Sequence, residues 1–239
     1  MEQDRSAANR RLYEIGGRED SFRPSPYCWR IRMALAHKGL AFEPVPWRAV
    51  EKDRIARSGG GTVPVLVEGD MWLNESWDIA QYLDAKYADK PLFGCPGDVV
   101  KARHLDHWVT TGLHPVIFRA VALDQFPMLA EKDQAYYRER TKRKFGQTLE
   151  AFCGDLNAAM AELDGLLAPL QSTLGVYPFL GGEAPGYGDY VVFGAFQWAR
   201  VASTRSLAAE DTPLMQWFQR LLGAFDGFAA AQPARDHWG

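Results

Sequence analysis

The stretch Ser25-Pro26-Tyr27-Cys28 has the spacing of a redox-active Cys-x-x-Cys pair, but its first position holds a hydroxyl and only Cys28 carries a thiol. Serine followed by proline is typical of a helix start, with Ser25 as the N-cap and Pro26 as the first helical residue. A hydroxyl at that place lies beside unpaired backbone N–H groups and the positive end of the helix dipole, which together favour an anion. A thiolate is such an anion, although the same two residues also suit an ordinary helix cap.

A second candidate lies in Thr62-Val63-Pro64-Val65, where a proline begins a strand although it cannot donate a ladder hydrogen bond. This placement suits a cis Val63–Pro64 bond, which turns the N–H and C=O of Val63 toward an extended ligand backbone. A trans proline at a strand edge is the alternative, and the cis form is the rarer of the two. The pattern therefore indicates a ligand-binding position only in combination with other elements.

A third candidate is the pair Glu75-Ser76, which stands between a strand and the next helix in the sequence LNESW. The pair fits a helix cap, and it also fits the recognition of an amino-acid head group. In the second case the carboxylate of the ligand meets Ser76 and the helix N-terminus, while its ammonium group meets Glu75.

A metal site is the alternative use of the histidines. His104, His107 and His114 lie at helical spacing, but no carboxylate-rich or cysteine partner joins them in a ligand pattern, so we predict no metal. We expect instead that His107, together with Trp108 and Thr111, lines a hydrophobic substrate cleft.

Two other patterns do not indicate a site. The glycine run at residues 59–61 lacks the lysine and hydroxyl residue of a phosphate-binding loop. The basic cluster Arg138–Lys144 is expected on the solvated face of a helix.

Short strands alternate with short helices over residues 1–92. Apolar and β-branched runs bounded by turn residues predict strands at residues 11–15, 42–47, 63–67 and 71–73. Caps and spacings of three and four predict helices at residues 26–38, 51–58 and 75–87. The order β-α-β-α-β-β-α is that of a thioredoxin-like domain.

The rest of the chain has helical patterns only. A Gly/Pro-rich linker at residues 93–98 precedes a second domain, residues 99–239, which we predict to be a C-terminal helical bundle. Apolar residues at steps of three and four predict one long amphipathic helix over residues 145–170 as its spine. Further helices are expected at residues 99–126, 189–203 and 213–228.

The composition sets the class of protein. The 239 residues are 47% apolar and 13% aromatic, which is enough for a core without metal or disulfide support. Three widely spaced cysteines favour a reducing compartment, so we expect a cytoplasmic protein. The polar N-terminus lacks a secretory core, and no run reaches the ~20 apolar residues of a membrane span. Interspersed charges with a net of −3 argue against nucleic acid as a partner.

These elements occur in the order and at the spacing found in the cytosolic glutathione transferases, which the sequence resembles over nearly its whole length. The stretches that carry the resemblance are SPYCWRIRMALAHKGL, TVPVLV, NESWDIAQYLDAKY and FLGGEAPGYGDYVVFGAF. The SPY-x-WR helix start, the WDIAQYLDAKYADKPLFG stretch and the LMQWFQRLLGAFDGF ending look most like the serine-type enzymes related to β-etherases, which use glutathione to cleave aryl ethers of lignin-derived compounds.

The resemblance implies that glutathione is the cofactor and brings the sulfur that position 25 lacks. Ser25 would then be the activating catalytic hydroxyl, with Ser21 as an alternative in the same loop. The cofactor-binding residues that it implies are Val63 and Pro64 for the cysteinyl backbone, and Glu75 and Ser76 for the γ-glutamyl end.

The implied activity is attack of the glutathione thiolate on an apolar, aromatic electrophile, as in detoxification, with β-aryl ether cleavage included. The family also implies a homodimer. For the glycyl carboxylate of glutathione, Trp47, Arg48 and Lys52 all stay open.

Two positions depart from the family pattern. Gly186 stands where a Ser or Thr usually caps the central helix three residues before Asp189, and Cys28 occupies the resolving position of a thiol pair. We expect Cys28 to be a packing thiol. The rival functions are a thiol transferase or reductase that uses Cys28, and a non-catalytic protein that binds glutathione or hydrophobic ligands.

Overall fold

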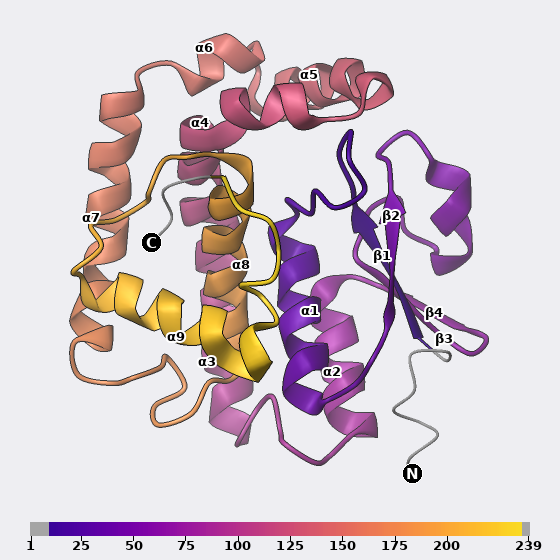
Figure 1. Cartoon of the computed structure of the whole chain (residues 1–239), viewed down its shortest axis with the longest axis vertical. Coiled ribbons are helices and arrows are strands. Elements are labelled where there is room, and N and C mark those ends of the chain that lie inside the picture. Colours follow the sequence, from indigo (N-terminus) through magenta and orange to yellow (C-terminus); the bar gives the residue numbers. More distant parts are fainter. Residues whose placement is uncertain (1–9, 236–239) are drawn as a thin grey trace.

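The structure is a computed structural model that describes residues 10–235. The polar N-terminus, for which we expect no secretory signal, lies almost wholly outside these residues. Figure 1 shows the two halves of the chain side by side: a small sheet with helices α1 and α2 against it, and a larger group of helices beyond them.

The sheet has four strands in the order β2-β1-β3-β4. Strand β2 runs parallel to β1, whereas β3 is antiparallel to both β1 and β4. Their bounds are β1 Arg10–Ile15, β2 Glu43–Trp47, β3 Val65–Glu68 and β4 Met71–Asn74. All four strands lie where the sequence predicts them.

Three helical elements complete this half: α1 Pro26–Lys38, the 3-10 helix η3 Lys52–Ser58 and α2 Ser76–Lys86. Ser25 caps α1, and Gly39 ends it with a left-handed φ of 65° that costs glycine little. The order β-α-β-α-β-β-α confirms the predicted thioredoxin-like half.

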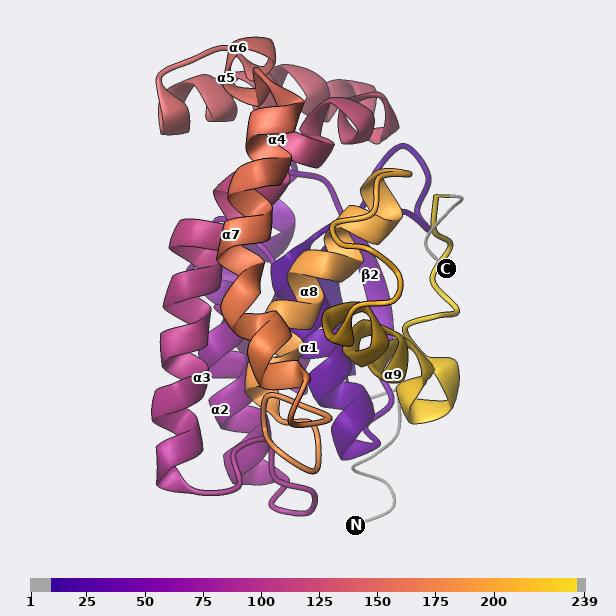
Figure 2. The ribbon, with the colours of Figure 1, turned by 90° about the vertical axis from the view of Figure 1, so that its left-hand side faces the viewer.

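The second half is helical among the described residues, as predicted. Its elements are α3 Pro96–Trp108, η4 Val109–Leu113, α4 His114–Gln125, η5 Phe126–Met128, α5 Glu131–Phe145, α6 Leu149–Cys153, α7 Leu156–Leu174, α8 Tyr187–Ala202 and α9 Pro213–Gly227. In both Figure 1 and Figure 2, α5 and α6 lie across one end of the bundle.

The single long helix predicted over residues 145–170 is wrong. Three helices occupy this region, because the backbone leaves the helical conformation at Gly146, with a φ of 73°, and at Gly154, with a φ of 50°. The apolar spacing continues across both breaks, so periodicity alone joins separate helices into one. Only α7 is the expected spine, and it packs on α4 and α9.

The helix predicted at residues 99–126 is present but irregular. Between α3 and α4 the chain makes a π turn, η4, in which the N–H of His114 reaches back to the C=O of Val109. Pro115 has no N–H to continue the regular ladder, and a π turn is one way for a helix to pass such a residue.

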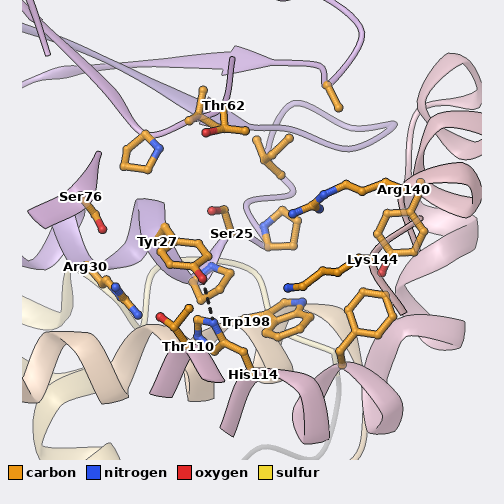
Figure 3. A pocket seen from close by; sticks show the side chains of 18 of the residues that line it. Ser25, Tyr27, Arg30, Thr62, Ser76, Thr110, His114, Arg140, Lys144 and Trp198 are labelled. Atoms are coloured by element: carbon orange, nitrogen blue, oxygen red, sulfur yellow. Dashed lines mark hydrogen bonds between the residues drawn. The ribbon is translucent and has the colours of Figure 1, made fainter. Parts of the chain in front are cut away.

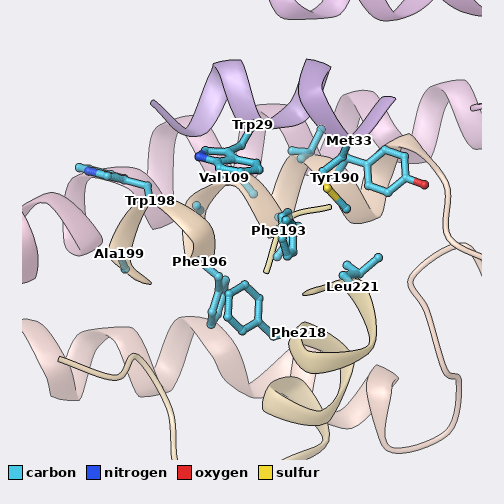
Figure 4. Close-up of a cluster of buried hydrophobic side chains, with 14 of the residues drawn as sticks. Trp29, Met33, Val109, Tyr190, Phe193, Phe196, Trp198, Ala199, Phe218 and Leu221 are labelled. Atoms are coloured by element: carbon cyan, nitrogen blue, oxygen red, sulfur yellow. The ribbon is translucent and has the colours of Figure 1, made fainter. Parts of the chain in front are cut away.

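The core of the molecule lies where α1 packs along α8. Every residue of α8 except Gly188 is buried, and its aromatic side chains meet those of α1 and α9, as in the Trp29–Phe193 and Phe193–Phe218 pairs (Figure 4). At Gly194, a Cβ atom would lie 2.3 Å from the C=O oxygen of Pro26, so any other residue there would push the two helices apart.

Asp189 fixes the start of α8. Its buried carboxylate accepts N–H bonds from Leu180 at 2.8 Å, Gly181 at 3.1 Å, Gly186 at 3.0 Å and the Trp217 indole at 2.8 Å. The carboxylate part of the predicted capping box is therefore present even though Gly186 supplies no side chain.

We predict that Asp189→Asn lowers the free energy of unfolding by about 2 to 3 kcal/mol, because the amide turns a donor toward N–H groups that then lack an acceptor. Urea denaturation of the purified protein measures this change. Asp164→Asn, at an exposed position of α7, is the matched control. Equal stability of the two variants would contradict the role of Asp189.

Across residues 10–235, no helix combines the length and the apolar character needed to cross a membrane.

Candidate active site

A cleft of about 520 Å³ lies between the sheet half and the helical half. Five residues singled out from the sequence line it together: Ser25, Val63, Pro64, Glu75 and Ser76. They come from three separate segments of the sheet half, and the fold brings them to one surface (Figure 3).

Ser25 stands at the N-terminus of α1 and faces the cleft (Figure 3). Its side-chain oxygen accepts a 3.3 Å hydrogen bond from the N–H of Cys28, which leaves the hydroxyl hydrogen to turn toward a ligand. The first turn of α1 contains no acidic residue that would offset the positive end of the helix dipole. The position therefore suits a negatively charged atom in contact with the hydroxyl.

Cys28 lies one turn further along the same helix and is buried, with 1% of its surface exposed. Burial, helped by the negative charge of Glu14, raises the pKa of the thiol to about 12. The thiolate is therefore rare at neutral pH, and the buried position agrees with the expectation of a packing thiol.

The Val63–Pro64 peptide bond is cis, as predicted. Both residues face the cleft across from Ser25. Thr62, the residue before them, is exposed and also lines the cleft.

Glu75 and Ser76 form the start of α2 at the same cleft. Glu75 has a φ of 65° and a ψ of 117°, a region that residues other than glycine rarely adopt, and its side chain makes no cap hydrogen bond. Such outliers gather at binding sites. Ser76 is buried, and its C=O accepts a 2.9 Å bond from the Tyr187 hydroxyl.

The sequence left open which residue could bind the glycyl carboxylate and which serine of the loop faces the ligand, and the structure narrows both choices. Trp47 and Lys52 line the cleft, whereas Arg48 pairs with Asp20 at 2.6 Å outside it. Ser21 is exposed, and its C=O accepts a bond from a glutamine side chain in the last part of the chain. Ser25 is therefore the serine of this loop that faces the cleft.

The first turn of α1 also forms the floor of the cleft. The Tyr27 hydroxyl lies 3.3 Å from Nδ1 of His114, and the Arg30 guanidinium lies over the Tyr27 ring at 4.5 Å (Figure 3). Arg30 also pairs with Asp106 of α3, a contact that ties the two halves together. Burial and the nearby positive charge of Arg30 hold the pKa of His114 well below its usual value, so this imidazole is neutral.

The helical wall of the cleft differs from the sequence prediction. His107 lines it as expected, but the prediction for Trp108 and Thr111 is wrong: Trp108 packs against the core, and Thr111 is exposed. Thr110 and His114 face the cleft instead.

One face of α5 also lines the cleft, which the sequence analysis missed. Its members recur at steps of three and one: Asp133, Tyr136, Tyr137, Arg140, Thr141 and Lys144. Arg140 and Lys144 are exposed, as expected for the basic cluster, but they also line the cleft, which was not expected. The spacing of these residues predicts a polar helix face. No sequence feature distinguishes a polar face that lines a cleft from one that faces solvent.

Glu51 holds α5 against the sheet half. Its carboxylate accepts bonds from Lys132 of α5 at 2.7 Å and from Arg54 at 2.6 Å. Partial burial acts to raise the pKa of this carboxyl, but the two cationic partners outweigh it and lower the pKa to about 2.

In the part of the chain that the structure describes, no three His, Cys, Asp or Glu side chains gather to hold a metal ion.

A thioredoxin-like half, a hydroxyl at a helix N-terminus and a cleft against a helical half together define the class of protein. Residues 24–86 match the N-terminal domain of the glutathione S-transferase family, and residues 102–226 match the C-terminal domain of the same family. The chain therefore belongs to the glutathione S-transferase family.

Individual relatives agree with this assignment. Glutathione S-transferase Z1 of Arabidopsis thaliana is 42% identical over 77 residues, which cover 30% of this chain and 34% of the relative, so the match spans about a third of that protein. Glutathione transferase GSTFuA3 of Phanerochaete chrysosporium has a TM-score of 0.81 at 21% identity and covers 93% of this chain and 98% of its own. Glutathione S-transferase CsGST63524 of Ceriporiopsis subvermispora, solved in complex with glutathione, has a TM-score of 0.78 at 18% identity and covers 95% and 99%.

We predict that the three cysteines react at very different rates with a thiol-specific chromogenic reagent. Cys95 is exposed and should react fast, whereas Cys28 and Cys153 are buried with raised pKa values and should react only on unfolding. Cys95→Ser should remove the fast phase. A fast phase that survives Cys95→Ser and disappears in Cys28→Ser would contradict this account.

We also predict that the stabilisation from the ion pairs of Glu51 is lost in acid. Because its pKa is lower in the folded chain than the ordinary value of 4.5, the stability that it adds is full above pH 4.5 and is lost as pH falls toward 2. The difference in unfolding free energy between wild type and Glu51→Gln should therefore shrink over that range. Glu139→Gln, exposed on α5, is the control, and a difference that does not change with pH would contradict the prediction.

Proposed function

We propose that this protein is a serine-type glutathione transferase, in which the Ser25 hydroxyl stabilises the thiolate of bound glutathione for attack on an aromatic electrophile. The observation that carries the proposal is the position of Ser25, which faces the cleft at the uncompensated N-terminus of α1. A free thiol has a pKa near 8.5, so only a few per cent is ionised at neutral pH. Each unit by which the site lowers that pKa corresponds to about 1.4 kcal/mol in favour of the thiolate.

Glutathione would lie along the sheet side of the cleft. In this arrangement Val63 and Pro64 contact its cysteinyl backbone, and Glu75 and Ser76 hold its γ-glutamyl end. Lys52 would bind the glycyl carboxylate, since its ammonium group reaches the cleft wall over the rings of Trp47 and Tyr136. The family membership and the glutathione complex of the Ceriporiopsis subvermispora protein support glutathione as the co-substrate.

The second substrate would occupy the helical side. Aromatic side chains there, among them Phe118, Phe145 and Trp198, favour an apolar ring. In a substitution, a sulfur–carbon bond forms, the leaving group departs with its electron pair, and the thiol proton passes to solvent. Cleavage of a β-aryl ether is the same reaction with an aryloxide as the leaving group, in line with the β-etherase-like sequence.

A thiol transferase that uses Cys28 is the weaker alternative. Such a reaction needs an accessible thiolate, and Cys28 is buried with a strongly raised pKa. The hydroxyl at position 25 suits a mechanism in which the cofactor supplies the sulfur.

The remaining features of the proposal rest on the family resemblance. We propose a division into a glutathione-binding domain at residues 1–92, a linker at 93–98 and a helical domain at 99–239. We also propose a homodimer that acts in the cytoplasm.

We predict that Ser25→Ala lowers kcat for the conjugation of glutathione with chlorodinitrobenzene by about a hundredfold, as expected when one hydrogen bond to a developing anion is lost. The KM for glutathione should change little, because other residues carry its binding. Ser21→Ala is the matched control, since that hydroxyl belongs to the same loop but lies outside the cleft lining.

The result that would contradict the proposal is full activity in Ser25→Ala. Glutathione binding by titration calorimetry without turnover of any aryl halide, aryl ether or enone would instead indicate a non-catalytic binding protein.

A further inference from the structure

The cleft-facing side of α5 carries two cations without a carboxylate partner. Arg140 and Lys144 line the cleft one helical turn apart, and Figure 3 shows both side chains reaching into it. Neither forms an ion pair with an acidic side chain of the described residues. All four of these cluster residues are exposed, but Lys142 and Arg143 lie outside the cleft lining.

The carboxylates of the cleft are already engaged or lie elsewhere. Asp106 pairs with Arg30 and with Arg103. Asp133 accepts the N–H of Val50 and lies about 16 Å from Lys144 along the helix axis. Glu75 belongs to the opposite wall, at the start of α2.

The cleft therefore has an excess of positive charge. Among the described residues, its lining holds five guanidinium or ammonium groups against three carboxylates, and Arg140 and Lys144 account for the difference. Like charges one turn apart destabilise a helix. Partial burial of the Lys144 amine, together with the Arg140 charge, lowers the pKa of that amine. A bound anion would relieve this repulsion.

The surroundings of Lys144 indicate whether glutathione or the second substrate supplies the anion. Figure 3 places its amine on the side of Trp198 and His114, away from Thr62. The His114 ring contacts the rings of Tyr27 and Trp198 edge-on, at centroid distances of 5.1 Å and 5.9 Å. This is the aromatic, helical side of the cleft.

The ammonium group of Lys52 lies at a different end of the cleft from that of Lys144. The Lys52 ammonium lies 5.2 Å from the centre of the Tyr136 ring, and Tyr136 stands about 12 Å before Lys144 along α5. The glycyl carboxylate of glutathione, which we place at Lys52, is therefore not the group that Lys144 faces.

We propose that the second substrate is an aromatic electrophile that carries a carboxylate, held by Lys144 and Arg140 while its ring lies against Trp198 and Phe118. This inference rests on the proposed glutathione transferase activity and narrows its substrate class. It makes the helical side of the cleft a site for acidic arenes.

The test compares chloronitrobenzoate with its methyl ester as electrophiles for glutathione. In both reactions the sulfur bonds to the ring carbon, chloride leaves with its electron pair, and the thiol proton goes to solvent. The quantity measured is the ratio of kcat/KM for the acid to kcat/KM for the ester, which cancels effects common to both. We expect Lys144→Gln to lower this ratio about tenfold, the loss of one charge-assisted hydrogen bond.

Lys142→Gln removes the same charge from the solvated side of α5 and should leave the ratio at the wild-type value. Arg140→Gln should lower it in the same direction as Lys144→Gln. An unchanged ratio in both cleft variants would overturn the proposal.

Two further outcomes separate this inference from the proposed function. If Lys144→Gln slows both electrophiles equally and raises the KM for glutathione, the cation serves glutathione and the inference fails while the activity stands. If the wild type turns over neither electrophile, the activity fails. Binding of chloronitrobenzoate and its ester, followed by intrinsic tryptophan fluorescence, then still tests the anion site: acid-selective binding that Lys144→Gln abolishes supports it, and equal binding overturns it.

Discussion

The close packing of α1 on α8 is the constraint on which the site depends. A glycine at position 194 lets the backbone of Pro26 approach α8 more closely than any side chain would allow. The Arg30–Asp106 ion pair ties the same helix to α3. Because Ser25 directly precedes these contacts, its hydroxyl has a fixed place relative to both halves, and the cleft opens where the two halves diverge from this junction.

Near the N-terminus of α1, an anion is favoured at one position and disfavoured at another. The N-terminus of α1 favours an anion at Ser25, where the cleft admits a ligand, but burial penalises an anion at Cys28, only one turn further on. A chain with its own nucleophilic thiol at position 25 would have the Cys-x-x-Cys spacing of a redox pair. With a hydroxyl there instead, the proposed mechanism takes its sulfur from bound glutathione, and in that mechanism the protein contributes charge stabilisation and positioning.

The sequence was sufficient for those elements whose signals are local. The caps at Ser25 and Gly39, the proline at the start of β3 and the β3–β4 hairpin each depend on a few neighbouring residues, and all are found where predicted. The helical half was harder because its apolar spacing runs through the breaks at Gly146 and Gly154. Glycine is tolerated inside helices as well as at their ends, so only tertiary packing decides which of the two applies.

The site was predictable on one wall and not on the other. Val63, Glu75 and their neighbours belong to motifs tied to a strand or helix start, whereas the opposite wall consists of helix faces whose orientation depends on packing. Thr110 and His114 line the cleft where Trp108 and Thr111 were expected, and the cleft-lining face of α5 has the polar pattern of a solvated face. The site that we propose for the second substrate therefore lies in the part of the molecule with the weakest sequence signals.

The ionisation of glutathione bound to the wild-type protein shows directly whether Ser25 stabilises its thiolate. Thiolate absorbance in the ultraviolet, followed as pH is varied with saturating protein, gives the pKa of the bound thiol. We predict a pKa at least about one unit below the free value near 8.5, and a return toward that value in Ser25→Ala. A bound thiol that titrates as it does in buffer, or a lowered pKa that Ser25→Ala leaves unchanged, would contradict it.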